Sequence, residues 1–236
     1  MYVFILRHGQ SRHNVDDPEN HPFHPALKDT EESDPSLTAH GKSQADRAGR
    51  RLAGIEFDAV FSGPLHRQID TACTAMRHQK KRPKIEILPD LTEWGHENLL
   101  GLPEQFYSVL FPDMEIVPTT DLSPTGCPRL LPPAGDDGNE RTSFNARGPY
   151  ITNYLKSRFS GSDKILLVTS CIFGGAVLGH HLLGLAETGS YNFDFTNTGI
   201  SMVEIRDDGS TKLHLVNEVT HLLTASAEDI PQYVIR

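Results

Sequence analysis

The chain has 236 residues, of which 37% are hydrophobic and 22% are charged, and this composition is typical of a globular protein. Its formal net charge of −9 disfavours nucleic acid as a partner, because binding to a phosphate backbone relies on a basic surface. No apolar run reaches the roughly 20 residues of a membrane span, and residues 1–6 lack the basic start of a signal peptide. Cys73, Cys127 and Cys171 are too irregularly spaced for a disulfide framework or a structural zinc site. We therefore expect one cytoplasmic domain over residues 1–236, with no membrane partner.

The start of the chain carries its most informative pattern. An apolar run over residues 2–6 ends in Arg7, His8 and Gly9, with Asn14 close behind. A short apolar run without alternation is typical of a strand buried on both faces, and open α/β sheets bind ligands outside the carboxyl ends of such strands. Arg7 offers a planar fork that matches phosphate, and His8 offers a nitrogen that can attack or relay protons. The alternative is a turn whose Arg7 and His8 simply face water.

Residues 15–36 are polar, acidic and rich in Pro and His, and we expect an exposed loop there. No further ligand keeps helical or hairpin spacing with His21 and His24, so solvated histidines are favoured over a metal site. The elements expected next are a helix capped by Thr38 and ended by Gly54, a strand over 57–61, a helix over 65–76 with Arg67 in its first turn, and a strand over 85–88.

Seven prolines interrupt residues 103–138, although residues 106–111 could form one or two helical turns. Such a long irregular stretch is unusual unless it is a lid or a binding loop, so we expect an inserted lid at about 103–139. The remaining expected elements are a helix from 139 to 159 that Gly148 and Pro149 kink or split, a strand over 165–169, a helix over 174–183 ended by Gly184, and strands over 201–206 and 212–216. The alternating order predicts an α/β fold, a three-layer sandwich with a mostly parallel central sheet and an inserted lid segment.

Further short motifs follow the first one in a fixed order. They are Leu37-Thr38 with Gly41, Gln44-Ala45 and Gly49; Ser62-Gly63-Pro64-Leu65-His66-Arg67 with Thr71-Ala72; Leu91, Glu93 and Gly101; and Asn197-Thr198-Gly199-Ile200-Ser201. Together with Leu6-Arg7-His8-Gly9-Gln10-Ser11 and Asn14, this set resembles the signature of the histidine phosphatase superfamily, in its phosphoglycerate-mutase-like branch. The resemblance covers most of the chain apart from about residues 106–139.

The resemblance implies roles for individual residues. His8 would attack the substrate phosphorus, and water would then hydrolyse the phosphohistidine. Arg7, Arg67 and Asn14 would hold the phosphoryl oxygens. Glu93 matches the carboxyl group that protonates the leaving oxygen, although a surface carboxylate before a turn would look the same. The family chemistry implies no metal and no cofactor.

One departure from the family pattern concerns the end of the strand over 165–169. Relatives carry a second histidine directly after this strand, whereas this chain has Ser170 and Cys171. Counting from the strand puts Ser170 at the histidine position, and counting back from the end of the next helix puts Cys171 there. We favour Ser170, because a helix absorbs an extra residue more easily than a buried strand slips. Both residues join the expected phosphate-binding set, and losing one preorganised donor typically lowers the rate by about 10²–10³.

Several rival functions are weighed against phosphatase chemistry. A cysteine phosphatase built on Cys171 would need an arginine where the chain has Val177. His180 and His181 are adjacent and point about 100° apart on a helix, so they cannot bind one metal ion together. A mutase is disfavoured because the acidic residues 15–19 would repel a carboxylate-bearing phosphoester. We expect hydrolysis of a small phosphorylated metabolite, with a non-catalytic phospho-ligand-binding module as the alternative, and the oligomeric state stays open.

Overall fold

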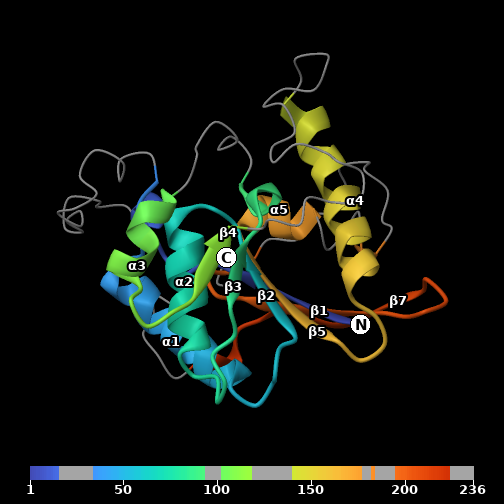
Figure 1. Ribbon diagram of the computed structural model, residues 1–236, viewed down its shortest axis with the longest axis horizontal. Helices are drawn as coiled ribbons and strands as arrows, with labels where there is room; N and C mark the ends of the chain where they lie inside the picture. Colours follow the sequence, from blue (N-terminus) through green and yellow to red (C-terminus); the bar gives the residue numbers. More distant parts are fainter. Residues whose placement is uncertain (16–33, 94–101, 119–139, 177–181, 184–194, 224–236) are drawn as a thin grey trace, which may run out of the picture.

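The computed structural model describes residues 1–15, 34–93, 102–118, 140–176, 182–183 and 195–223 (Figure 1). The expectations for His21, His24, Val177, His180 and His181 lie outside the described residues. Within the described ranges, no helix is both long enough and apolar enough to cross a membrane.

A seven-stranded sheet forms the centre of the molecule, with the strand order β4-β3-β2-β5-β1-β6-β7. The strands are β1 (Tyr2–Arg7), β2 (Ala59–Ser62), β3 (Ile85–Ile87), β4 (Ile116–Pro118), β5 (Lys164–Thr169), β6 (Ile200–Ile205) and β7 (Thr211–Glu218). The first five run parallel, whereas β6 and β7 are antiparallel to their neighbours. The expected mostly parallel sheet is confirmed.

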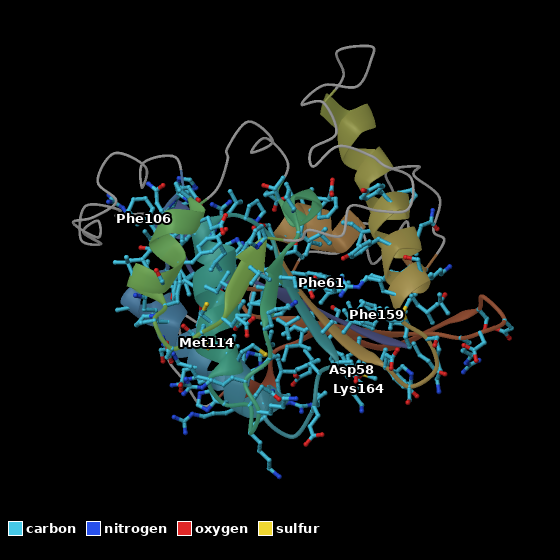
Figure 2. The ribbon with its side chains drawn as sticks, viewed as in Figure 1. Asp58, Phe61, Phe106, Met114, Phe159 and Lys164 are labelled. Carbon is cyan, nitrogen blue, oxygen red and sulfur yellow. The ribbon has the colours of Figure 1, made fainter. Side chains whose placement is uncertain are left out.

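Helices cover both faces of this sheet (Figure 1). They are α1 (Ala39–Leu52), α2 (His66–Met76), α3 (Tyr107–Leu110), α4 (Glu140–Arg158) and α5 (Cys171–Ala176), with 3-10 turns η1 (Arg12–Asn14), η4 (Pro89–Leu91), η5 (Glu104–Phe106) and η7 (Thr220–Leu222). The helices α1 and α2 pack on one face, and α4 and α5 pack on the other. On the α4 face Phe61 meets Phe159 edge to face, with ring centroids 6.2 Å apart (Figure 2). These layers are the expected three-layer sandwich.

The helix boundaries follow capping signals in the sequence. Thr38 Oγ1 accepts a hydrogen bond from the Gly41 amide at 3.0 Å, as an N-cap residue does at the start of a helix. The helix α4 continues through Pro149 instead of splitting there. Ile151 and Leu155 are fully buried, and their packing stabilises the turns after the proline.

Part of the segment expected to be irregular forms regular structure. The short strand β4 pairs parallel with β3, and Tyr107 and Phe111 are buried on the same face as α2. Pro118 ends β4, where the outer position of the strand in the sheet tolerates a residue without an amide hydrogen. Residues 119–139 lie outside the described residues, so a lid there stays a prediction.

The pairing of β1 with β5 sets up the edge of the sheet where the parallel strands end, called the carboxyl edge below. Arg7 pairs with Thr169 in the parallel register. The His8 amide then donates to the Thr169 carbonyl at 2.9 Å, which extends the ladder by one residue. His8 and Ser170 therefore leave neighbouring strands at the same level.

Candidate active site at the carboxyl edge

His8 lies at the end of β1 with 4% of its surface exposed. Its Nδ1 lies 2.7 Å from the Gly9 carbonyl oxygen. A carbonyl only accepts hydrogen bonds, so Nδ1 carries the proton and donates it, and Nε2 keeps its lone pair in the neutral ring. Burial lowers the pKa of His8 well below its ordinary value, and the charges of Arg67 and Arg7 lower it further. The ring is therefore neutral near pH 7, with a lone pair on Nε2.

Two guanidinium groups stand beside this ring. Arg7 Nη1 donates to the Phe195 carbonyl, and Arg67 Nη1 lies 3.6 Å from a carboxylate oxygen of Asp34. Burial lowers the pKa of Arg67, and the charge of Asp34 counteracts this effect. Within the described residues, Arg7 Nε and Arg67 Nη1 have no hydrogen-bond partner. Both arginines thus retain donors for an anion.

Asn14 ends the short turn η1 after β1 and is exposed. Its Oδ1 accepts from the Ser11 amide at 3.1 Å, from Ser11 Oγ at 3.2 Å and from Asn197 Nδ2 at 3.4 Å. Asn197 Nδ2 also donates to the His8 carbonyl at 3.0 Å. These bonds fix the oxygen end of the Asn14 amide, so its NH₂ group is left to donate to another oxygen.

Glu93 follows η4 and is buried, so it is not a surface carboxylate. Its Oε2 accepts from the Ile172 amide at 3.1 Å, and its Oε1 accepts from the Phe173 amide at 3.0 Å. These amides lie in the first turn of α5, where the helix itself offers no acceptor. Glu93 therefore fixes the start of α5, and α5 in turn holds the carboxyl group at the carboxyl edge.

Ser170 and Cys171 have different surroundings. Ser170 lies between β5 and α5, is fully buried, and its Oγ is 3.0 Å from Gln68 Nε2. Cys171 opens α5, and its Sγ accepts from the Phe195 amide at 3.3 Å. The Phe195 carbonyl also accepts from Arg7, so Cys171 and Arg7 are linked through one residue. All seven residues expected from the sequence lie at the carboxyl edge.

Gly9 packs closely against the start of α1. A Cβ atom at Gly9 would lie 2.5 Å from the Gly41 carbonyl oxygen, closer than real side chains come. The Gly9 amide donates to Thr71 Oγ1 at 3.0 Å, and Thr71 Oγ1 donates to the Arg67 carbonyl at 2.7 Å. The turn after His8 is thereby pinned to both α1 and α2.

Asp34, Gln68 and Asn197 contribute to the site although sequence reasoning gave them no role. Asp34 was expected in an exposed loop, but 7% of its surface is exposed and its carboxylate accepts from the His66 amide at 2.9 and 3.0 Å. Asp34 is a carboxylate shortly before the start of α1, and such a position suggests a helix cap. The helix that Asp34 caps is nevertheless α2, which comes later in the chain. Asn197 is the first residue of the motif at residues 197–201, and it connects Asn14 to His8.

These features place the chain in a class of three-layer α/β proteins that present a neutral histidine and two arginines at the carboxyl edge of a parallel sheet. The family description "Histidine phosphatase superfamily (branch 1)" matches residues 3–218. The chain therefore belongs to the histidine phosphatase superfamily.

Curated relatives share parts of their sequences with this chain. It is 31% identical to the fructose-2,6-bisphosphatase TIGAR of Xenopus laevis over 134 residues, which cover 56% of this chain and 42% of the relative. It is 35% identical to a 2,3-bisphosphoglycerate-dependent phosphoglycerate mutase of Rhizobium etli over 104 residues, which cover 42% of this chain and 44% of the relative. The chain thus spans less than half the length of these relatives.

Solved structures resemble this chain over nearly its whole length. The phosphoserine phosphatase of Entamoeba histolytica superposes with a TM-score of 0.59 at 21% identity, covering 94% of this chain and 99% of that one. The alpha-ribazole phosphatase of Shigella flexneri gives a TM-score of 0.60 at 18% identity, covering 92% and 96%. At this level of identity the likeness establishes the fold.

Proposed function

We propose that this chain hydrolyses a phosphomonoester through a phosphohistidine on His8, without a metal ion. The observation that carries the proposal is the hydrogen bond from His8 Nδ1 to the Gly9 carbonyl, because it leaves the Nε2 lone pair free in a buried, neutral ring. Arg7 and Arg67 supply positive charge beside that nitrogen, as transfer of a phosphoryl group requires. Membership of the histidine phosphatase superfamily supports the same chemistry.

The reaction proceeds in two displacements. In the first, the Nε2 lone pair forms a bond to phosphorus, and the bond from phosphorus to the ester oxygen breaks with its electron pair on that oxygen. In the second, water gives a proton to the carboxylate of Glu93 and forms a bond to phosphorus, the bond from phosphorus to Nε2 breaks with its electron pair on Nε2, and inorganic phosphate leaves. Donors from Arg7, Arg67, Asn14 and Ser170 hold the phosphoryl oxygens, while Cys171 positions Arg7 through Phe195.

Glu93 is the proposed acid for the leaving oxygen. Its carboxyl group is buried beside the start of α5, and each of its oxygens accepts one backbone amide. A carboxyl oxygen has two lone pairs, so an oxygen that accepts one amide can also carry a proton. Protonation of the ester oxygen by Glu93 would then let the alcohol leave without a negative charge.

The proposed substrate class is a small phosphorylated metabolite. Named relatives are phosphatases of such compounds or phosphoglycerate mutases. Hydrolysis is favoured over the mutase reaction because residues 15–19, which follow Asn14 in the sequence, are acidic and would repel a carboxylate-bearing phosphoester.

Trapping the phosphohistidine tests the proposal. We expect the native chain, mixed with a reactive aryl phosphate and quenched within a turnover, to gain the mass of one phosphoryl group. His8→Ala should gain none, and its release of phosphate should fall by about a thousandfold or more because the nucleophile is gone.

The matched control is His78→Ala. His78 Nε2 lies 2.7 Å from Asp46 Oδ1, and this pair is remote from the carboxyl edge. This variant should be labelled like the native chain. Equal labelling of the native chain and His8→Ala would overturn the assignment of the nucleophile.

A second candidate function is a module that binds a phosphorylated ligand without turning it over. The observation that favours it is Ser170 at the end of β5, where the family resemblance leads one to expect a second histidine. This candidate would be supported if the native chain bound orthovanadate but released no phosphate from a panel of phosphorylated metabolites.

A further inference from the structure

Gln68 is a buried polar residue beside Arg67 for which neither the sequence nor the proposed reaction provides a role. It lies in the first turn of α2 and has no exposed surface. Its Oε1 accepts from the Leu65 amide at 3.1 Å, and its Nε2 donates to the Leu91 carbonyl and to Ser170 Oγ, both at 3.0 Å. Gln68 therefore links the start of α2, the segment that leads to Glu93, and the end of β5.

The orientation of this side-chain amide follows from its partners. The Leu65 amide can only donate, so it must meet the oxygen of Gln68, and the Leu91 carbonyl can only accept, so it must meet the nitrogen. The two hydrogens of Nε2 are then used by Leu91 and Ser170. Ser170 Oγ is consequently the acceptor in its bond with Gln68.

This arrangement leaves the hydrogen of the Ser170 hydroxyl available. Among the described residues, no protein acceptor takes it. The nearby Leu91 carbonyl cannot do so, because it already accepts from Gln68 and from Thr169 Oγ1 at 2.9 Å. The register of β1 and β5 puts Ser170 at the level of His8 on the neighbouring strand, so a phosphoryl group carried by His8 is a candidate acceptor for this hydrogen.

The structure makes room for Gln68 at one further position. A Cβ atom at Gly63 would lie 2.1 Å from Gln68 Oε1, so the turn after β2 accommodates the amide only because residue 63 is glycine. A side chain that is fully buried, satisfied by three hydrogen bonds and given space by a glycine is held in one conformation. Gln68 can therefore fix the direction of its hydrogen bond with Ser170, in which the Ser170 oxygen accepts.

We propose that Gln68 is a positioning residue, which directs the Ser170 hydroxyl to donate a hydrogen bond to the phosphoryl group carried by His8. The inference rests on the proposed function and deepens it. A neutral hydroxyl oriented in advance stabilises the charge that gathers on the phosphoryl oxygens during transfer, without a reorganisation cost at that moment. Gln68 itself touches no reacting atom.

A double-mutant cycle tests this role, with the native chain, Gln68→Met, Ser170→Ala and the double variant. For an aryl phosphate we expect each single variant to lower kcat by about tenfold with a much smaller change in KM, because the bond strengthens in the transition state. The double variant should be no slower than Ser170→Ala, since Gln68 acts through Ser170. Orthovanadate affinity should follow the same pattern, with a loss of about fivefold for each single variant.

The control is Gln79→Met, which removes another buried glutamine, whose Nε2 donates to the Leu52 carbonyl at 3.1 Å. It should lower the Tm but leave kcat unchanged. If Gln68→Met does not fold, Gln68→Leu replaces it in the cycle, because its side chain is also apolar and lacks the Nε2 donor.

The outcomes separate this inference from the proposed function. A native chain that neither turns over a phosphoester nor binds vanadate overturns both. A native chain that turns over, with kcat unchanged in Gln68→Met and Ser170→Ala, overturns the positioning role alone. The positioning role is also overturned if Gln68→Met lowers kcat by the same factor in the Ser170→Ala variant as in the native chain. If the native chain binds vanadate without turnover, the vanadate affinities of the same four chains decide.

Discussion

The two edges of the same parallel sheet are closed in different ways. At the carboxyl edge, Arg67, Gln68 and Ser170 are buried, with Gln68 Nε2 hydrogen-bonded to Ser170 Oγ and Arg67 Nη1 at 3.6 Å from an oxygen of Asp34. At the opposite, amino edge, Asp58 is exposed, and its Oδ2 accepts from the Lys164 amide at 2.8 Å, while its own amide donates to the Lys164 carbonyl at 2.9 Å (Figure 2). Burying a polar group costs free energy unless it is fully hydrogen-bonded. The stability of the fold alone therefore does not explain why these polar side chains are buried at the carboxyl edge.

A cavity lined by residues of α1, β1, β6 and β7 sharpens the contrast. It has a volume of about 520 Å³ and is lined by residues that include Tyr2, Ile55, Met202 and Leu215. Its lining is mainly apolar, whereas the carboxyl edge gathers donors, acceptors and charges. Buried polarity, rather than open volume, therefore distinguishes the candidate active site in this molecule.

The largest expected difference between the edges is in stability. Asp34→Asn should lower the free energy of unfolding by about 3 kcal/mol, because the buried charge of Arg67 loses its counter-charge. Asp58→Asn, which changes an exposed acceptor at the amino edge, should cost no more than about 0.5 kcal/mol. Urea unfolding followed by circular dichroism measures both values. Equal losses would show that the Asp34 carboxylate does not neutralise Arg67.

Anion binding should separate two arginines of the same helix region. Arg67→Ala should weaken orthovanadate affinity by about tenfold or more, since a charge-assisted hydrogen bond contributes about 1.5–3 kcal/mol. Arg77→Ala is the matched control, because Arg77 follows the other end of α2 and binds Asp113 at the surface. Its vanadate affinity should equal that of the native chain. Titration calorimetry gives both constants, and an unchanged value for Arg67→Ala would mean that its guanidinium does not face the anion.

The smallest expected effect is a pH dependence at the carboxyl edge. The pKa of His8 is lowered in the folded chain, so below about pH 6.5 the unfolded chain binds a proton that the folded chain does not. The native chain therefore loses stability as the pH falls from 7 to 5.5. His8→Asn should lose about 1 kcal/mol less over this interval, because it lacks that proton. Equal losses of stability in the native chain and in His8→Asn would show that His8 has the same pKa in the folded and unfolded states.

The parts of the fold that could be predicted from the sequence are those with a local signal. The apolar runs of β1 and β5, and Thr38 at the start of α1, carry such signals, and they place His8 and Ser170 directly after strands. The pairing of these two strands is a tertiary contact that the structure supplies. The strand β4 carries no such local signal. It has only three residues, ends at a proline and lies at the outside of the sheet.

The contacts of Asp34 and Gln68 could not be predicted, for two physical reasons. Asp34 reaches a helix that is not the next one in the chain, so no spacing in the sequence connects it to Arg67. Gln68 belongs to α2, a helix buried at every position from His66 to Met76, and a polar residue there looks in the sequence like one on a solvent-facing side. Tertiary packing alone makes it a link between three segments.

The hydrogen bond that selects the reactive nitrogen of His8 ends on the main-chain carbonyl of Gly9 rather than on a side chain. Every residue type supplies such a carbonyl, so no substitution can delete the acceptor itself. The regiochemistry of the proposed phosphorus–nitrogen bond would therefore be encoded in the path of the backbone. That path depends on the close approach of Gly9 to Gly41, where one added methyl group would lie 2.5 Å from a carbonyl oxygen. The choice between the two imidazole nitrogens is thus vulnerable at a position that has no side chain at all.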